Sequence, residues 1–464
     1  MSLTYAVVAL GRPTFDVPYA EARMKAAFAA LDAAGIACVG PRHLLFDADA
    51  AREALAGLRS HRVDLLLILQ VTFTDATMTV ELARSLEVPL AIWALPEPRA
   101  GGRLRLNALC GLNLATHALG KAGHQPNWLY RDPEDTQIGP ALRALADPRP
   151  TASASPAVPS PIADEKAERA LAALQNMRIA VFGSHPDGFD TCAYDKERLK
   201  ALGNIEVRHV PLGDLFEQAK AVDPARVANV RAEEARVLGN LDEMDRDQLD
   251  RSLRSFLALS DAGRAMGAKS VAVRCWPEFF TEYGCAACGP VALLNEAMTP
   301  AACEADVHGS ISQLLLQELA EEPAWMTDLV DVDPEDDTAV LWHCGSAPLS
   351  MRDPDSPAEA TIHTNRKMPL LHQYTIRPGR ITLARLSEAK GELKLMLGGA
   401  EVIRRPMAFT GTSGTIRFDR PASEVLGRIL DEGLEHHFAI AYGDHRPALR
   451  AVAGRLGLPV LELC

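Results

Sequence analysis

The sequence predicts an α/β protein in which two doubly wound α/β domains are followed by a smaller antiparallel, β-rich and barrel-like domain. Three observations favour this fold class. Strand-first units with amphipathic helices open the chain and recur near residue 178, and such alternation builds parallel sheets. From about residue 339 the pattern changes to short segments between turn residues, which is typical of antiparallel sheets. The chain also has 464 residues, 48% of them hydrophobic, enough for two or three cores.

The first domain is predicted over residues 1–145. The apolar run 5–10 reads as a buried strand and leads into an amphipathic helix. Apolar runs at 64–69 and 90–94, separated by a further helical stretch, repeat the pattern. Because parallel strands need a crossover connection, usually a helix, these runs predict a parallel sheet.

A linker is predicted over residues 146–172 and a second α/β domain over residues 173–338. The first part of the linker, up to residue 164, is rich in Pro, Ala and Ser and has no apolar period. The second domain shows strand-like runs followed by a long, charged helical stretch and a returning strand. These segments are residues 178–182, 206–210, 224–266 and 269–273.

The third domain, residues 339–464, is predicted to be β-rich. Its turn signals are Pro378-Gly379 and Gly398-Gly399. A mixed terminal stretch, which carries the sequence His436-His437, follows from residue 422. The strand-like segments between these signals are residues 339–342, 372–376, 380–386, 392–397 and 415–418.

Composition excludes several classes of protein. The formal net charge is −13, whereas nucleic-acid partners require a basic face. No apolar run reaches the roughly 18 residues of a membrane span, and the first residues do not resemble a secretory signal. We therefore expect a cytoplasmic protein with no nucleic-acid or membrane partner. The nine cysteines, including Cys285 and Cys288 in a CxxC spacing, predict reduced packing thiols.

Acidic residues follow two strand-like runs of the second domain. Glu278 comes soon after 269–273, and Asp306 comes between a short apolar run and a helix. Ligands bind at the carboxyl ends of strands in such sheets, so two acids there can share one divalent cation. The alternative is that Glu278 is a surface acid and that Asp306 caps its helix.

Histidines and arginines elsewhere in the chain could likewise be either site residues or structural residues. His437 or His343 could reach a metal, but paired histidines are more often structural. Arg12 and Arg99 follow the first and third strand-like runs and could contact substrate or stabilise loops.

The combination of motifs resembles the L-fucose isomerase and L-arabinose isomerase family, especially its shorter fucose-isomerase-like members, over nearly the whole chain. Segments near the N-terminus, GRPTFD and PLAIWALPEP, also resemble this family's sugar-facing loops. The motifs that carry the resemblance are Trp276-Pro-Glu278, Ala302-Cys-Glu304-Ala-Asp306-Val-His-Gly309, His343-Cys-Gly-Ser-Ala-Pro348 and Glu435-His-His437-Phe-Ala-Ile-Ala-Tyr-Gly443.

The resemblance implies a homo-oligomer of three-domain subunits with active sites near subunit boundaries. It implies Mn²⁺ or Mg²⁺ held by Glu278, Asp306 and His437, with Glu278 and Asp306 also moving protons. The second-choice metal ligands are Glu304, Asp328 and His343. The residues expected to contact the sugar are Arg12, Trp93, Arg99 and His343.

The function expected from this resemblance is metal-dependent aldose–ketose isomerisation of a free pentose, deoxyhexose or modified hexose through an enediolate. Two alternatives remain open at this point. One is a catalytically silent sugar-binding or regulatory protein, and the other is a metal-assisted epimerase or lyase.

Overall fold

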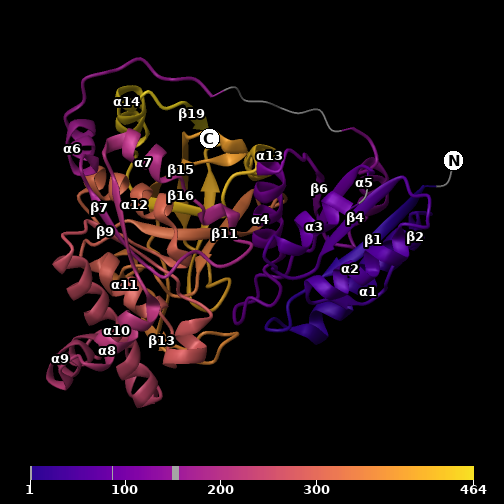
Figure 1. The fold of residues 1–464 in the computed structure, drawn as a ribbon. Coiled ribbons are helices and arrows are strands. Elements are labelled where there is room, and N and C mark those ends of the chain that lie inside the picture. The colour runs from indigo at the N-terminus through magenta and orange to yellow at the C-terminus, as the bar shows by residue number, and fades with distance from the viewer. Residues whose placement is uncertain (1–2, 86, 149–155) are drawn as a thin grey trace.

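The computed structural model describes residues 3–85, 87–148 and 156–464. Within these residues the chain forms two parallel sheets and one large mixed sheet, all packed with helices (Figure 1). The predicted α/β class is therefore confirmed. No helix in the described ranges is both long and apolar enough to cross a membrane.

The N-terminal sheet is parallel, in the order β2-β1-β4-β5-β6, and the short β3 also pairs with β1. Strands β1, β4 and β5 are almost wholly buried, as expected when helices cover both faces. Helix α1 begins after Asp16, whose carboxylate accepts a hydrogen bond from the Tyr19 amide at 3.2 Å. The elements are β1 (Thr4–Leu10), α1 (Val17–Ala33), β2 (Ala37–Val39), β3 (Leu44–Leu45), α2 (Ala48–Leu58), β4 (Leu65–Gln70), α3 (Thr77–Ser85), β5 (Leu90–Ala94), α4 (Ala108–Lys121), β6 (Asn127–Tyr130) and α5 (Ile138–Ala144).

The second sheet has four parallel strands in the order β10-β9-β7-β8. The stretch 224–266, predicted as helical, forms two long helices, α9 and α10, because Asp245 caps a new helix through the Gln248 amide at 2.9 Å. The elements are α6 (Glu165–Leu174), β7 (Arg178–Phe182), η1 (Asp190–Cys192), α7 (Lys196–Gly203), β8 (Glu206–Val210), α8 (Leu212–Lys220), α9 (Pro224–Glu234), η2 (Leu241–Glu243), α10 (Arg246–Ala265), β9 (Ser270–Val273), η3 (Phe279–Tyr283), α11 (Cys288–Glu296), β10 (Ala301–Ala302), η4 (Cys303–Ala305) and α12 (Val307–Ala320).

The mixed sheet follows the order β13-β14-β17-β12-β11-β18-β15-β16-β19, and its pairs are antiparallel except β14–β17 and β16–β19. Strand β16 also pairs with β17, so the hydrogen-bonded path through six strands returns to its start. The elements are β11 (Trp325–Asp333), β12 (Thr338–His343), η5 (Leu349–Met351), β13 (Glu359–Thr361), β14 (Leu371–Thr375), β15 (Gly379–Ser387), η6 (Ala389–Gly391), β16 (Lys394–Ile403), β17 (Thr412–Phe418), α13 (Ala422–Glu432), β18 (His437–Tyr442), α14 (Arg446–Leu456) and β19 (Val460–Glu462).

The turn predicted at Gly398-Gly399 was wrong, because both glycines lie inside β16. A Cβ on Gly398 would lie 3.3 Å from the Cys464 sulfur, and one on Gly399 would collide with the Arg380 guanidinium. The absence of a side chain at these glycines therefore lets the Cys464 sulfur and the Arg380 guanidinium approach β16 closely, which is one reason that glycine occurs inside a strand.

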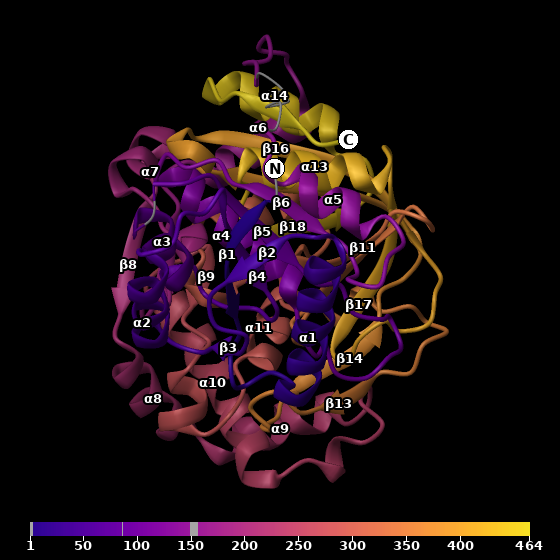
Figure 2. The same cartoon turned by 90° about the vertical axis from the view of Figure 1, so that its right-hand side faces the viewer.

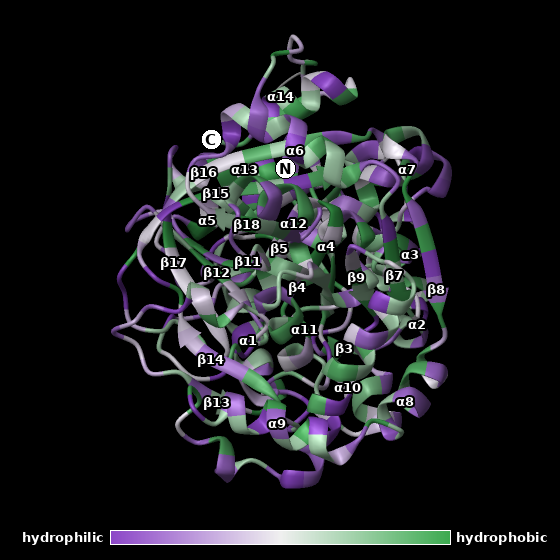
Figure 3. Ribbon diagram, turned by 90° about the vertical axis from the view of Figure 1, so that its left-hand side faces the viewer, coloured by the Kyte–Doolittle hydropathy of each residue, from purple (hydrophilic) through white to green (hydrophobic). Residues whose placement is uncertain are grey.

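Two helices join the three sheets. Helix α4 contacts β4 and β5 of the N-terminal sheet and β11 of the mixed sheet, whereas α12 contacts β9 and β10 on one side and β11, β15 and β18 on the other. In Figure 2 the N-terminal unit lies in front of the rest of the molecule. Hydrophobic and hydrophilic residues alternate along the outer helices α8 and α10 (Figure 3), which pack through one face.

The predicted domain boundaries stay predictions, as does the barrel-like third domain. Helix α6 begins at Glu165, inside the predicted linker, and residues 149–155 of that linker lie outside the described residues. Strand β11 falls in the range predicted for the second domain but pairs within the mixed sheet.

Candidate active site

One cavity receives side chains from all three sheet units. Most of these residues lie directly after a strand, in a connection or at a strand end, which is where α/β sheets bind ligands. Those most relevant to chemistry are Arg12, Phe73, Cys110, Trp276, Phe280, Glu304, Asp328, His343, Arg366 and His436.

Glu304 follows β10 and is held from two sides. The Trp276 indole N–H donates to its Oε1 at 3.3 Å, and the His436 Nε2 lies 3.0 Å from its Oε2. Burial raises the pKa of Glu304, but the hydrogen bond to His436 and the charges of the nearby imidazoles outweigh burial and lower it to about 2. Glu304 is therefore a carboxylate over the whole physiological range.

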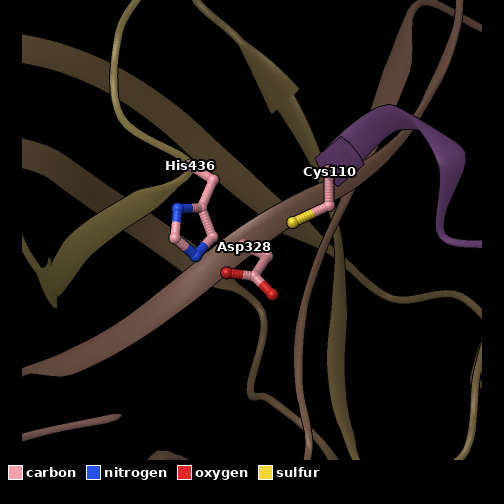
Figure 4. A group of neighbouring side chains, drawn as sticks. All are labelled: Cys110, Asp328 and His436. Atoms are coloured by element: carbon pink, nitrogen blue, oxygen red, sulfur yellow. The ribbon is translucent and has the colours of Figure 1, made fainter. Parts of the chain in front are cut away.

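Asp328 lies on β11, where it pairs with His437 of β18. Its Oδ1 is buried and has no hydrogen-bond partner among the described residues. The His437 Nε2 lies 3.5 Å from this atom and also 3.5 Å from Glu304 Oε2. Figure 4 shows Asp328 with His436 and Cys110, whose ligand atoms all lie within 4.8 Å of one another. A buried carboxylate oxygen without a partner is costly, so this position suits a bound cation.

Asp306 is fully buried, and both of its carboxylate oxygens already have hydrogen-bond partners. It caps α12 through the Gly309 amide at 2.8 Å, and Arg385 donates to both carboxylate oxygens. Its Oδ2 also lies 2.8 Å from His437 Nδ1. Burial raises the pKa of Asp306, but the Arg385 charge and the His437 hydrogen bond hold it far below its usual range.

The Asp306 contact leaves the His437 Nε2 facing Glu304 and Asp328. A carboxylate on one ring nitrogen fixes the tautomer and orientation of a histidine whose other nitrogen binds metal. Three groups of residues with metal-binding capacity share His437: one with Glu304 and His436, one with Asp328 and His343, and one with Cys192 and Asp306. His343 is positioned by the Cys344 amide, which donates to its Nδ1 at 2.8 Å.

The remaining residues predicted for the site are distributed unevenly. Arg12 and His343 line the cavity, whereas Glu278, Trp93 and Arg99 do not. Glu278 is paired with the Arg274 Nε at 2.8 Å. Trp93 is wholly buried and donates its indole N–H to the Arg131 carbonyl, and Arg99 is paired with Asp331 at 2.5 Å.

Sequence reasoning missed the cavity residues Cys110, Phe73, Arg366 and His436 as site residues and ranked Glu304 and Asp328 second. One usable signal is that Asp328 interrupts the apolar run of β11, a position where a carboxylate is costly. Another is that Asp306 directly precedes a helix, which favours capping. The remaining residues come together only through the packing of three sheets.

Comparison with known proteins shows similarity to sugar isomerases. Residues 6–144 match the model of the N-terminal domain of fucose/sulfoquinovose isomerases. The chain is 28% identical over 447 residues to a sulfoquinovose isomerase of Priestia megaterium, covering 95% of both chains. It is 29% identical over 406 residues to one of Alkalicoccus urumqiensis, covering 86% of both. A third, of Clostridium sp., is 27% identical over 458 residues, covering 98% of this chain and 97% of the relative.

Three observations define the protein as an isomerase: its fold, its buried cluster of carboxylates and imidazoles, and these relatives. Over residues 6–144 by the family model and over most of its length by these relatives, the chain is similar to the fucose/sulfoquinovose isomerases.

Proposed function

We propose that the protein is a metal-dependent aldose–ketose isomerase of a sulfonated hexose, with sulfoquinovose as the first candidate. Sulfoquinovose is a 6-deoxyglucose that carries a sulfonate on C6. The observation that carries the proposal is the position of the His437 Nε2 beside the cavity, 3.5 Å from Glu304 Oε2 and 3.5 Å from Asp328 Oδ1, in two neighbouring groups of residues that could hold a metal. The names of the relatives supply the substrate.

The donor set fits a divalent cation such as Mn²⁺ or Mg²⁺. Two carboxylates and one imidazole suit Mn²⁺ better than they suit a structural Zn²⁺ ion. The buried Asp328 Oδ1, which has no hydrogen-bond partner among the described residues, would also gain a partner in the ion. We propose that Glu304, Asp328 and His437 hold the ion, in place of Glu278 and Asp306. When bound, the ion would polarise the carbonyl and hydroxyl oxygens of the sugar and stabilise negative charge that develops on them.

The residues of the chain would carry out the proton transfers. In the open-chain aldose, one of the two carboxyl groups, Glu304 or Asp328, removes the proton from C2. The electron pair moves to the C1 oxygen and gives an enediolate. The other carboxylate moves the hydroxyl proton from the C2 oxygen to the C1 oxygen. The first carboxylate exchanges its proton with solvent and then protonates C1. His436, 3.0 Å from Glu304, orients that carboxylate.

Proton NMR in D₂O tests this function. The protein is treated with EDTA, reloaded with Mn²⁺ and incubated with sulfoquinovose or L-fucose. We expect deuterium at the exchanged carbon, a ketose product only in the reloaded sample, and faster conversion of sulfoquinovose. Failure of both sugars to exchange a proton would refute the isomerase proposal. An epimeric aldose or a shorter product would support the epimerase or lyase alternative.

Replacement of Glu278 by Gln separates the two candidate carboxylate sets. Because Glu278 does not line the cavity and its carboxylate is already paired with Arg274, we expect Glu278→Gln to retain turnover within about threefold, far less than the loss of a general acid or base. Initial rates at saturating Mn²⁺ measure this. A loss of about 100-fold or more, the size expected for an acid or base, would return Glu278 to the catalytic set.

The homo-oligomer, its active sites near subunit boundaries and the cytoplasmic location stay predictions. Size-exclusion chromatography with light scattering checks the first of these.

A further inference from the structure

Two guanidinium groups line the same cavity as the proposed metal ligands. Arg12 follows β1, and Arg366 belongs to the loop 363–366, all four residues of which line the cavity. Arg366 is half-buried. Burial and then the Arg12 charge lower the pKa of Arg366, so the two positive charges act on each other.

Their existing partners leave this part of the cavity positively charged. Arg12 pairs with Asp75 at 2.5 Å and lies over the rings of Phe73 and Trp276. Arg366 lies 5.9 Å from the Phe280 ring centroid and has no carboxylate partner among the described residues. Two guanidinium groups and one carboxylate give a net charge of one positive unit.

The loop that carries Arg366 is held in place by side chains. The His363 Nδ1 accepts hydrogen bonds from the amides of Asn365 and Arg366, both at 3.3 Å. Arg103 donates to the Asn365 side-chain oxygen at 3.1 and 2.8 Å. A cation that is already positioned loses less entropy when it binds an anion.

We propose that Arg12 and Arg366 bind the anionic group on the far carbon of the sugar and select a singly charged sulfonate. This inference rests on the proposed function and deepens it. A sulfonate carries one negative charge and offers three acceptor oxygens, which guanidinium forks match. A phosphate monoester carries about 1.5 to 2 negative charges at pH 7, more than this group of side chains neutralises. A methyl or hydroxymethyl group would leave the two cations unneutralised.

The variant Arg366→Met tests the proposal with three sugars: sulfoquinovose, glucose 6-phosphate and 6-deoxyglucose. Loss of a charge-assisted hydrogen bond weakens binding by about 10- to 100-fold. We expect the KM for sulfoquinovose to rise by that factor with kcat changed less than about threefold, and kcat/KM for 6-deoxyglucose to stay the same. Arg366→Lys should recover part of the loss.

Lys367→Met is the matched control, since it removes one positive charge from the next residue, which is exposed and does not line the cavity. It should behave as the wild type does. Unchanged KM for sulfoquinovose in Arg366→Met, or an equal loss with 6-deoxyglucose, would refute the role of Arg366. A wild-type preference for glucose 6-phosphate would refute the selection of a single charge.

Calorimetric titration with 6-deoxy-6-sulfoglucitol, which has no carbonyl group to isomerise, separates this inference from the proposed function. We expect the wild type to bind it and Arg366→Met to bind about 10- to 100-fold more weakly. A wild type that binds the alditol but converts no sugar would overturn the isomerase function and leave the anion site standing. Equal affinity in both proteins would overturn the anion site alone.

Discussion

Replacing Glu304 by Gln is expected to reduce turnover by about 1000-fold, within the range seen for loss of a general acid or base. Glutamine keeps the size of the side chain but removes the negative charge. That charge serves two purposes in our proposal, binding the cation and moving a proton. The amide oxygen of glutamine can accept from the Trp276 indole, which now contacts Oε1 at 3.3 Å, and the amide N–H can donate to the His436 Nε2, which now lies 3.0 Å from Oε2, so the fold should survive.

Single-turnover and steady-state rates for Glu304→Gln, measured at several Mn²⁺ concentrations, check this prediction. The rate should stay low even at saturating Mn²⁺, because the proton carrier is absent. Glu278→Gln is the matched control. A Glu304→Gln protein with more than about a tenth of the wild-type rate would contradict a role in general acid–base catalysis.

Replacing Arg385 by Met is expected to lower the free energy of unfolding by about 3 to 5 kcal/mol, the usual effect of removing one partner from a buried ion pair. Arg385 and Asp306 are both wholly buried. Met fills most of the volume but leaves the Asp306 charge without its cation. The Arg385 Nε also lies 4.0 Å from the buried Glu435 carboxylate, which would lose its neighbour too.

Urea denaturation measures this effect. The control Arg405→Met breaks an exposed pair, 3.2 Å from Asp336, and should cost at most about 1 kcal/mol. Adding Asp306→Asn to Arg385→Met should recover part of the loss, because no unpaired charge remains. Equal stability of Arg385→Met and wild type would show that the buried pair contributes nothing.

The same pair gives a pH dependence with a defined sign. The pKa of Asp306 in the folded protein lies below its ordinary value of 3.8 because, against burial, the Arg385 charge and the His437 hydrogen bond favour the ionised form. The stabilisation is therefore complete above about pH 4 and lost as the pH falls toward the folded value. The stability gap between wild type and Arg385→Met should narrow below pH 4.

The sequence predicted the helices and strands well wherever the hydrophobic pattern and the turn residues indicate the same element. Strands such as β1 and β7 are continuous apolar runs, and such runs are the strongest local signal. The Gly398-Gly399 prediction was wrong because the reason for these glycines is the approach of Arg380 and Cys464, residues distant in sequence or on another strand. Local pattern carries no information on such contacts.

The site was only partly predictable from the sequence, for a related reason. His437 could be picked out by its motif, but Glu304, Asp306 and Asp328 are three acids within one segment of the chain. Which of them faces a cavity depends on Arg385, which pairs with Asp306, and on β18, which brings His437 opposite Asp328. Arg366 has no signal of its own, because the role that we propose for it depends on its loop and Arg12 lining the same cavity.

Anomalous diffraction at the manganese edge, from crystals grown with Mn²⁺, tests the central claim most directly. We predict one strong peak beside the cavity, within about 2.0 to 2.4 Å of Glu304 and Asp328 oxygens and of the His437 Nε2, and no such peak in Glu304→Gln crystals. A peak at Glu278, or no peak in the wild type at saturating Mn²⁺, would contradict the proposed metal site.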